Sequence, residues 1–247
     1  MNKFSTIVFV SALLALPSAA MAMDVICPPL ARDGIADLAA AYTQKTGIPV
    51  TVKAVVMGKI MDDIKAGPVD VILLPSILME KLQTDQGLQA GSRQKLGRME
   101  IGLAVRPGMP HPDISTVEKF ASALKKAAAV AYTQPGPPRY SMEAGIIDQM
   151  LHRPEFSGVH LMPITTDSGI TALAKGNADM ALQATSAIVS RKDVELVGAL
   201  PPELGAHIDL DVASAPKAAD AKAALDFIHY ITRQEAAENW KRFGVNR

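Results

Sequence analysis

Short apolar runs alternate with helical patterns along the first part of the chain. The run at 69–74 is apolar almost throughout, as expected for a parallel strand that is covered on both faces. Between strands, apolar residues recur at i, i+3, i+4 and i+7, the spacing of one helix face: Ile35, Leu38, Ala39 and Tyr42. Strands are predicted at 25–28, 50–56 and 69–74, each followed by a helix. This order predicts a parallel sheet with right-handed crossovers.

The same alternation recurs in the second part of the chain. Further strands are predicted at 98–105, 127–132, 159–164, 178–183 and 194–197. Two capping boxes predict helix starts: Ser115-Thr116-Val117-Glu118 and Thr232-Arg233-Gln234-Glu235. Another helix is predicted from the turn Gly136-Pro137-Pro138, because proline suits a first helical turn. The chain then returns as an extended segment, 207–213, and ends in helices at 218–231 and 234–243.

The two α/β blocks follow each other without a polar linker. The crossings are the strand-like segments around 102–106 and 209–214. We therefore predict a first lobe from 23–104 with a return of 212–247, and a second lobe from 105–211. Two lobes joined by two extended strands form a cleft that can close by hinge motion. In open α/β sheets the ligand sits beyond the carboxyl ends of the strands.

Residues 1–22 have the pattern of a signal peptide. Lys3 precedes a ten-residue apolar run, Ile7 to Leu16, and Ala20-Met21-Ala22 reads as an A-x-A cleavage site. The run is too short for a bilayer core of about 30 Å. We expect cleavage after Ala22 and export of a soluble protein to the periplasm. Asp24 argues against lipidation of Cys27, which we expect to be a buried thiol.

Composition narrows the classes of function. The chain has 25 Lys+Arg, 25 Asp+Glu and 49% hydrophobic residues, which fits a globular protein with no net charge. Nucleic-acid binding usually needs a basic face, so we expect no nucleic-acid partner. The single cysteine excludes an intramolecular disulfide and cysteine-based metal cages in this sequence. We expect a monomer without metal or cofactor.

Signatures of catalysis are weak. The five histidines are scattered without metal-ligand spacing. Ser122-Ala123-Leu124-Lys125 matches the S-x-x-K pattern of penicillin-recognising enzymes, but no S-D-N or K-T-G follows. We therefore expect binding without turnover. Two alternatives stay open: a periplasmic hydrolase or transferase that uses a histidine or the Ser122/Lys125 pair, and a binding protein that feeds a sensory receptor.

The strand-to-helix turns carry the candidate chemistry. A helix N-terminus presents free N–H groups and about half a positive charge, which suits an anion. Arg139 could clamp a carboxylate with two hydrogen bonds, and Lys59 could add a point charge. The candidate turns are Pro28-Pro29-Leu30, Met57-Gly58-Lys59, Pro75-Ser76, Gly136-Pro137-Pro138-Arg139-Tyr140 and Gln183-Ala184-Thr185-Ser186.

The order and spacing of several stretches resemble one known family, the periplasmic substrate-binding proteins of the molybdate-binding type. These stretches are 35–42 with Lys45-Thr46-Gly47, 64–71, Pro138-Arg139-Tyr140, 170–173 with Gly176-Asn177-Ala178-Asp179, and Ala237-Glu238-Asn239-Trp240 with Phe243-Gly244. The resemblance implies the α/β, two-domain type 2 periplasmic binding protein fold, with two parallel-sheet lobes, two crossover strands and a central ligand cleft. It also implies delivery of the ligand to a membrane ABC permease.

The departures from that family concern the ligand. Molybdate binders place hydroxyl side chains where this sequence has Pro28-Pro29, Met57-Gly58-Lys59 and Gln183. A site that loses such donors loses selectivity by orders of magnitude. We therefore expect a small anion other than molybdate, an organic carboxylate or another oxyanion. The predicted ligand-binding residues are Pro29, Lys59 and Ser76 on the first lobe and Arg139, Tyr140 and Gln183 on the second.

Overall fold

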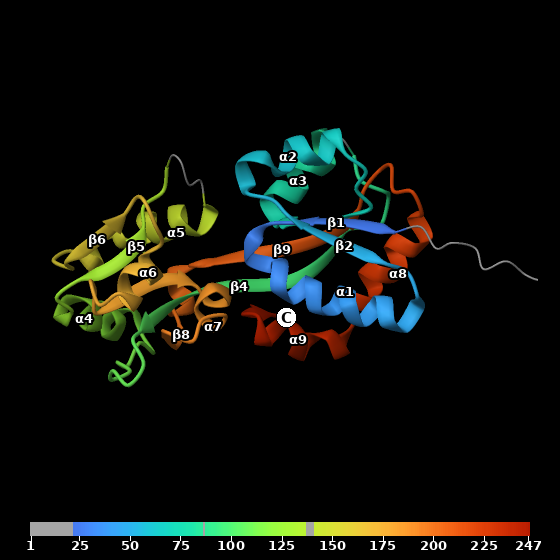
Figure 1. The fold of residues 1–247 in the computed structure, drawn as a ribbon. Helices are drawn as coiled ribbons and strands as arrows, with labels where there is room; N and C mark the ends of the chain where they lie inside the picture. The colour runs from blue at the N-terminus through green and yellow to red at the C-terminus, as the bar shows by residue number, and fades with distance from the viewer. Residues whose placement is uncertain (1–21, 86, 137–140) are drawn as a thin grey trace, which may run out of the picture.

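Two α/β lobes lie side by side and are spanned by two long strands, β4 and β9 (Figure 1). The computed structural model describes residues 22–85, 87–136 and 141–247. Residues 1–21 of the predicted signal peptide, and the predicted ligand-binding residues Arg139 and Tyr140, lie outside the described residues.

Lobe 1 begins with three strands that alternate with helices, as predicted from the sequence. β1 pairs in parallel with both β2 and β3, so it lies between them in the sheet. A short 3-10 helix, Pro29–Ala31, leads from β1 into α1. The elements are β1 (Met23–Cys27), α1 (Arg32–Thr46), β2 (Val50–Ala54), α2 (Met57–Ala66), β3 (Val71–Pro75) and α3 (Ser76–Asp85).

Lobe 2 repeats the arrangement around β5, which pairs in parallel with β6 and β7. β4 and β8 add antiparallel strands beyond β7. The lobe 2 elements are the second half of β4 (Gln94–Val105), α4 (Val117–Lys126), β5 (Val130–Thr133), α5 (Met142–Leu151), β6 (Leu161–Ile164), α6 (Gly169–Ala174), β7 (Met180–Ala184), α7 (Thr185–Val189) and β8 (Glu195–Ala199).

The chain returns to lobe 1 through β9 (His207–Ser214) and ends with α8 (Ala221–Thr232), α9 (Ala237–Arg242) and β10 (Val245–Asn246). β9 lies antiparallel between β3 and β4, and β4 continues to β7 in lobe 2. The strand order is β2-β1-β3-β9-β4-β7-β5-β6. The strands at the centre of each lobe therefore pair in parallel, and the antiparallel strands β4 and β9 connect the two lobes. The predicted crossings fall within β4 and β9, whereas the lobe boundaries at 104/105 and 211/212 stay predictions.

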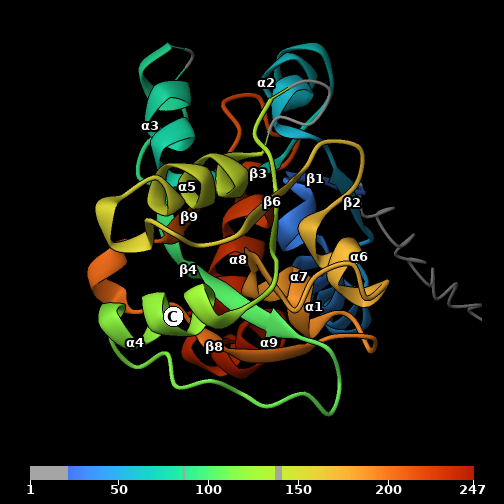
Figure 2. The ribbon, with the colours of Figure 1, turned by 90° about the vertical axis from the view of Figure 1, so that its left-hand side faces the viewer.

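Each lobe has a core on both faces of its strands, because alternate residues point to opposite faces. In lobe 1, Val25 and Cys27 of β1 face α1, α8 and α9, while Ile26 faces α2 and α3. In lobe 2, α4 and α5 lie on the opposite side of the strands from α6 and α7 (Figure 2). Trp240 of α9 is fully buried in the lobe 1 core, so the C-terminal helices belong to that lobe.

Neither predicted capping box marks the helix start that was expected from the sequence. α4 is capped by Thr116, whose Oγ1 accepts from the Lys119 N–H at 3.3 Å, one residue later than expected. Thr232 caps nothing, because it is the last residue of α8 and its hydroxyl lies 2.7 Å from the carbonyl oxygen of Ile228. A hydroxyl that bonds back into its own helix is not available to the next one.

Candidate functional site

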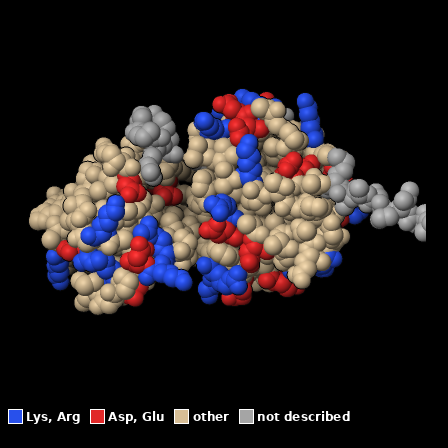
Figure 3. Space-filling model, viewed as in Figure 1, with Lys and Arg blue, Asp and Glu red and all other residues tan. Residues whose placement is uncertain are grey.

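A cavity of about 750 Å³ lies between the lobes, at the carboxyl ends of β1, β3, β5 and β7. Figure 3 shows the surface indented between the two lobes, with acidic and basic side chains interspersed over both. From lobe 1 the lining is Pro28, Pro29, Leu30, Asp33, Gly34, Val56, Gly58, Lys59, Pro75 and Phe243. From lobe 2 it is Thr133, Ser141, Met142, Glu143, Ser168, Gln183, Ser186, Ala187 and Ser190.

The N-termini of several helices surround this cavity. In each lobe, the chain passes from a parallel strand to the next helix at the same edge of the sheet. Val56 is extended and stands just before α2, so Gly58 and Lys59 form the first turn of that helix at the cavity. Ser141 caps α5 and Ser168 caps α6, each through its side-chain oxygen. The N–H groups of a first turn have no partner within their helix and carry partial positive charge. The cavity therefore suits negatively charged ligand groups.

The structure brings three of the predicted residues to the cavity: Pro29 and Lys59 from lobe 1 and Gln183 from lobe 2. Ser76 is not part of the lining. Its hydroxyl instead donates to Oδ1 of Asp211 on β9 at 2.8 Å, and Arg93 makes an ion pair with the same carboxylate at 2.6 Å. The Ser76 hydroxyl is thus engaged in tying α3 to β9.

A chain of hydrogen bonds on the lobe 2 side ends at Glu143. The Gly169 N–H donates to Oγ1 of Thr133 at 3.2 Å, and this hydroxyl donates to Oε1 of Gln183 at 3.5 Å. Nε2 of Gln183 then donates to Oε1 of Glu143 at 2.5 Å. Each donor and acceptor is matched along the chain, so one oxygen of the Glu143 carboxyl is held in place. The other, Oε2, has no hydrogen-bond partner among the described residues.

Burial raises the pKa of Glu143 from 4.5 to about 7. Removing a carboxylate from water disfavours its charged form, and the amide of Gln183 is a neutral donor that compensates only in part. Glu143 therefore exchanges its proton near neutral pH. Perturbed carboxyl groups in clefts mark candidate functional residues.

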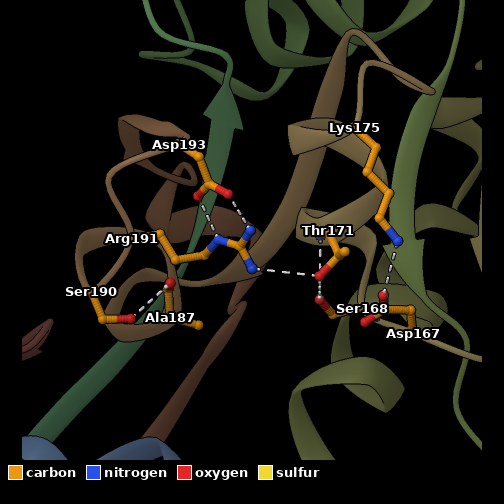
Figure 4. A network of polar contacts seen from close by, with 8 residues as sticks. All are labelled: Asp167, Ser168, Thr171, Lys175, Ala187, Ser190, Arg191 and Asp193. Atoms are coloured by element: carbon orange, nitrogen blue, oxygen red, sulfur yellow. Dashed lines mark hydrogen bonds and ion pairs between the residues drawn. The ribbon is translucent and has the colours of Figure 1, made fainter.

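Ser168 is held by a second polar network, drawn in Figure 4. Its Oγ lies 2.9 Å from Oγ1 of Thr171, which in turn lies 3.4 Å from Nη1 of Arg191. Arg191 makes two hydrogen bonds to Asp193, at 2.8 Å and 2.5 Å. The Arg191 guanidinium is therefore neutralised by Asp193 and serves to fix the segment around α6 and α7 rather than to bind an anion.

Glu143 was not among the predicted site residues, because the helix was expected to begin around Pro137 and Pro138. The helix begins at Met142, and Oγ of its cap Ser141 accepts from the Ala144 N–H at 3.3 Å. Glu143 thus stands in the first turn. Ser141 two residues before Glu143, a helix-capping residue followed by an acidic residue in the first turn, is the signal that could have identified it.

Within 22–85, 87–136 and 141–247, no group of three or more His, Cys, Asp or Glu residues is placed to hold a metal ion. In that part of the chain, no helix has the length and apolar character needed to cross a bilayer.

The model of a family described as bacterial extracellular solute-binding proteins matches residues 23–246. The chain belongs to this family. The fold of this solute-binding protein is also similar to the substrate-binding domain of a candidate molybdenum ABC transporter from Clostridium difficile. That pair has a TM-score of 0.76 and 13% identity over 92% of this chain and 99% of the other. The predicted fold, with two α/β lobes as in periplasmic substrate-binding proteins of the molybdate-binding type, is confirmed.

Two further similar proteins are described with organic anions, one as a ligand and one in the name of an enzyme. PEB3, solved with L-phospholactate bound, has a TM-score of 0.67 and 20% identity, over 91% of this chain and 99% of that one; the same protein from Campylobacter jejuni gives the same values. A Pseudomonas protein named aconitate isomerase is 26% identical over 210 residues, which is 83% of this chain and 79% of its own. The solved structures establish likeness of fold.

Proposed function

We propose that this solute-binding protein captures a small organic anion with carboxylate groups in the cavity between its lobes. The observation that carries the proposal is the position of the cavity, where strand ends and helix starts of both lobes meet around Lys59. Clefts of this kind close on their ligand by hinge motion, and β4 and β9 are the strands at which the lobes can move.

The size and polarity of the cavity favour an organic ligand over a tetrahedral oxyanion. About 750 Å³ lies within the range of roughly 300–1,000 Å³ that is usual for pockets of small organic molecules. Gln183 occupies the place of a hydroxyl donor in the molybdate-binding pattern, and its amide is already bonded to Glu143. A carboxyl group in the lining also repels a compact dianion, whereas it can bond to a hydroxyl or carboxylic acid group of an organic ligand.

Export and delivery complete the proposal. Cleavage after Ala22 would release the protein into the periplasm as a monomer, which hands its ligand to a membrane ABC permease. Intact mass of the secreted protein tests the first step; a mass that includes residues 1–22, or lipid on Cys27, contradicts it. A sensory receptor is the alternative recipient.

For the hydrolase alternative, Ser122 and Lys125 are both exposed on α4, and neither lines the cavity.

A thermal-shift screen tests the ligand class. The panel holds cis- and trans-aconitate, L-phospholactate, other di- and tricarboxylates, and molybdate. A ligand at 100 times its Kd stabilises by about 2.7 kcal/mol, so a true ligand gives a clear rise in Tm. We expect rises with carboxylates and none with molybdate; a rise with molybdate alone contradicts the proposal.

Calorimetry on two lysine variants then locates the site. Lys59→Ala removes the lysine of the cavity lining and should weaken binding about tenfold or more, as for a truncated charge partner. Lys65→Ala is the matched control, because Lys65 is exposed near the other end of α2 and does not line the cavity. Equal affinity of both variants contradicts the placement of the ligand.

A further inference from the structure

We propose that Glu143 is a catalytic acid–base group that moves one proton between two carbon atoms of an unsaturated polycarboxylate bound in the cavity. The protein would then isomerise such a ligand as well as bind it. The inference rests on the proposed function, since it needs a carboxylate ligand between the lobes.

The geometry around Glu143 is that of a positioned base, with one oxygen held by Gln183 and the other held by none of the described residues. Oε1 is fixed by Gln183 Nε2 at 2.5 Å, and Gln183 is itself oriented by Thr133. Oε2 has no partner among the described residues, and the side chain lines the cavity. A general base must have an oxygen that can reach the substrate while its neighbours hold its orientation. Glu143 meets both requirements.

The charged groups that share the cavity fit this role. Asp33 and Lys59 line it from lobe 1, opposite Glu143 on lobe 2. With its pKa raised to about 7, Glu143 can accept a proton and release it again at neutral pH. A base with a pKa near the working pH is the efficient choice for such transfer. Lys59 and the partial positive charge at the helix starts can stabilise the negative charge that develops on the ligand.

The step is balanced without any other reactant. The carboxylate of Glu143 takes a proton from the CH₂ group that lies between a carboxylate and a carbon–carbon double bond. The electron pair of the broken C–H bond spreads over three carbon atoms and the attached carboxylates. The protonated Glu143 then returns the proton to the far carbon of this system, and the double bond moves by one position. The shifted double bond can form as either geometric isomer.

The structure and one relative converge on this chemistry. The Glu143 carboxyl can hydrogen-bond to an organic ligand while it is protonated, but it repels a carboxylate group once it is ionised, so binding alone leaves its position in the cavity unexplained. The Pseudomonas relative at 26% identity is named aconitate isomerase, and aconitate is an unsaturated tricarboxylate. The sequence likeness covers 83% of this chain. An acid–base role explains why a carboxyl group lines a cavity that binds an anion.

The test follows cis- and trans-aconitate by proton NMR in D₂O with the full mature protein. We expect the wild-type protein to interconvert the isomers and to place deuterium from solvent on their carbon atoms. Glu143→Gln should bind aconitate within a few-fold of wild type by calorimetry but lose at least 100-fold in rate, the usual size of acid–base catalysis. Glu155→Gln, at an exposed glutamate outside the cavity, should keep the full rate.

Each outcome decides one of the two proposals. Binding of aconitate by the wild-type protein without isomerisation or deuterium uptake overturns the inference and leaves the proposed function standing. A full rate in Glu143→Gln overturns it too. Absence of binding of every carboxylate overturns the proposed function, and the inference with it. If Glu143→Gln fails to fold, Glu143→Asp replaces it: the retracted carboxyl should slow the reaction, and an unchanged rate contradicts the role.

Discussion

Nε2 of Gln183 on β7 donates to Oε1 of Glu143 in the first turn of α5, with 2.5 Å between the two atoms. The molybdate-binding pattern has a hydroxyl donor where Gln183 stands. The Gln183 amide donates to the carboxyl while its own oxygen accepts from Thr133. Gln183 therefore connects β7 to the first turn of α5 through Glu143.

Replacement of Gln183 tests the strength of this link. Gln183→Met removes the donor to Glu143, which is half-buried, and the acceptor of Thr133, which is buried. Leaving buried polar groups without partners costs about 1–3 kcal/mol, so the free energy of unfolding should fall by that amount. Urea unfolding measures it. Gln149→Met on the exposed side of α5 is the matched control and should change stability by less than about 0.5 kcal/mol. Equal effects of the two variants contradict the link.

The raised pKa of Glu143 predicts a specific dependence of stability on pH. The folded state binds this proton up to about pH 7, whereas the unfolded chain releases it near 4.5. Between these values the folded state holds more protons, so the free energy of unfolding falls as the pH rises and levels off above 7. The contribution is on the order of 3 kcal/mol at most, from about 1.4 kcal/mol for each pKa unit.

Comparison with two variants isolates this contribution from that of other groups. The glutamine of Glu143→Gln does not titrate. The difference between the Tm of this variant and that of the wild type should therefore shift in favour of the variant as the pH is raised from 4.5 to 7.5. Glu155→Gln should follow the wild-type curve throughout. Parallel curves for Glu143→Gln and wild type would show that Glu143 titrates normally.

The fold could be predicted from the sequence because its signals are local. Apolar runs, helical periodicity and glycine or proline stops identify strands and helices, and their order fixes the lobes. Contacts made at long range could not be predicted in the same way. β4 begins at Gln94 rather than near Arg98, because its first residues pair with β9, which lies far along the chain. Nothing in the stretch 94–97, which is Gln-Lys-Leu-Gly, indicates a pairing with β9.

The site residues show the same difference between local signals, which could be predicted, and long-range contacts, which could not. Lys59 and Gln183 could be placed at the cavity from the sequence because turns that follow parallel strands meet at one edge of each sheet. Ser76 stands at the same edge, but its hydroxyl bonds to Asp211, which is 135 residues away in sequence. Glu143 was missed since the start of α5 depends on the cap at Ser141 rather than on the prolines before it.

The single cysteine should be inert in the folded protein. Cys27 is fully buried at the end of β1, and burial raises the pKa of its thiol to about 12. The thiolate is the reactive species, and its population at pH 8 is negligible under these conditions. We expect a thiol-specific reagent to label the native protein only as fast as it unfolds, and to label the protein in guanidinium at once. Rapid labelling of the native protein would contradict this prediction.

Gly34 should tolerate no side chain, although it stands in a helix. A Cβ at Gly34 would lie 2.8 Å from an edge carbon of the Trp240 ring, which is fully buried and cannot retreat. Overpacking costs about 1–3 kcal/mol, against a gain of up to about 1 kcal/mol from the better helix propensity of alanine. Gly145→Ala in α5 supplies the control, since a Cβ there meets no atom within 4 Å. The free energy of unfolding of Gly34→Ala should therefore lie about 1–3 kcal/mol below that of Gly145→Ala. Fluorescence of Trp240, the only tryptophan in the sequence, should shift in the first variant alone; equal stability and an unchanged spectrum would show that the ring has room to move.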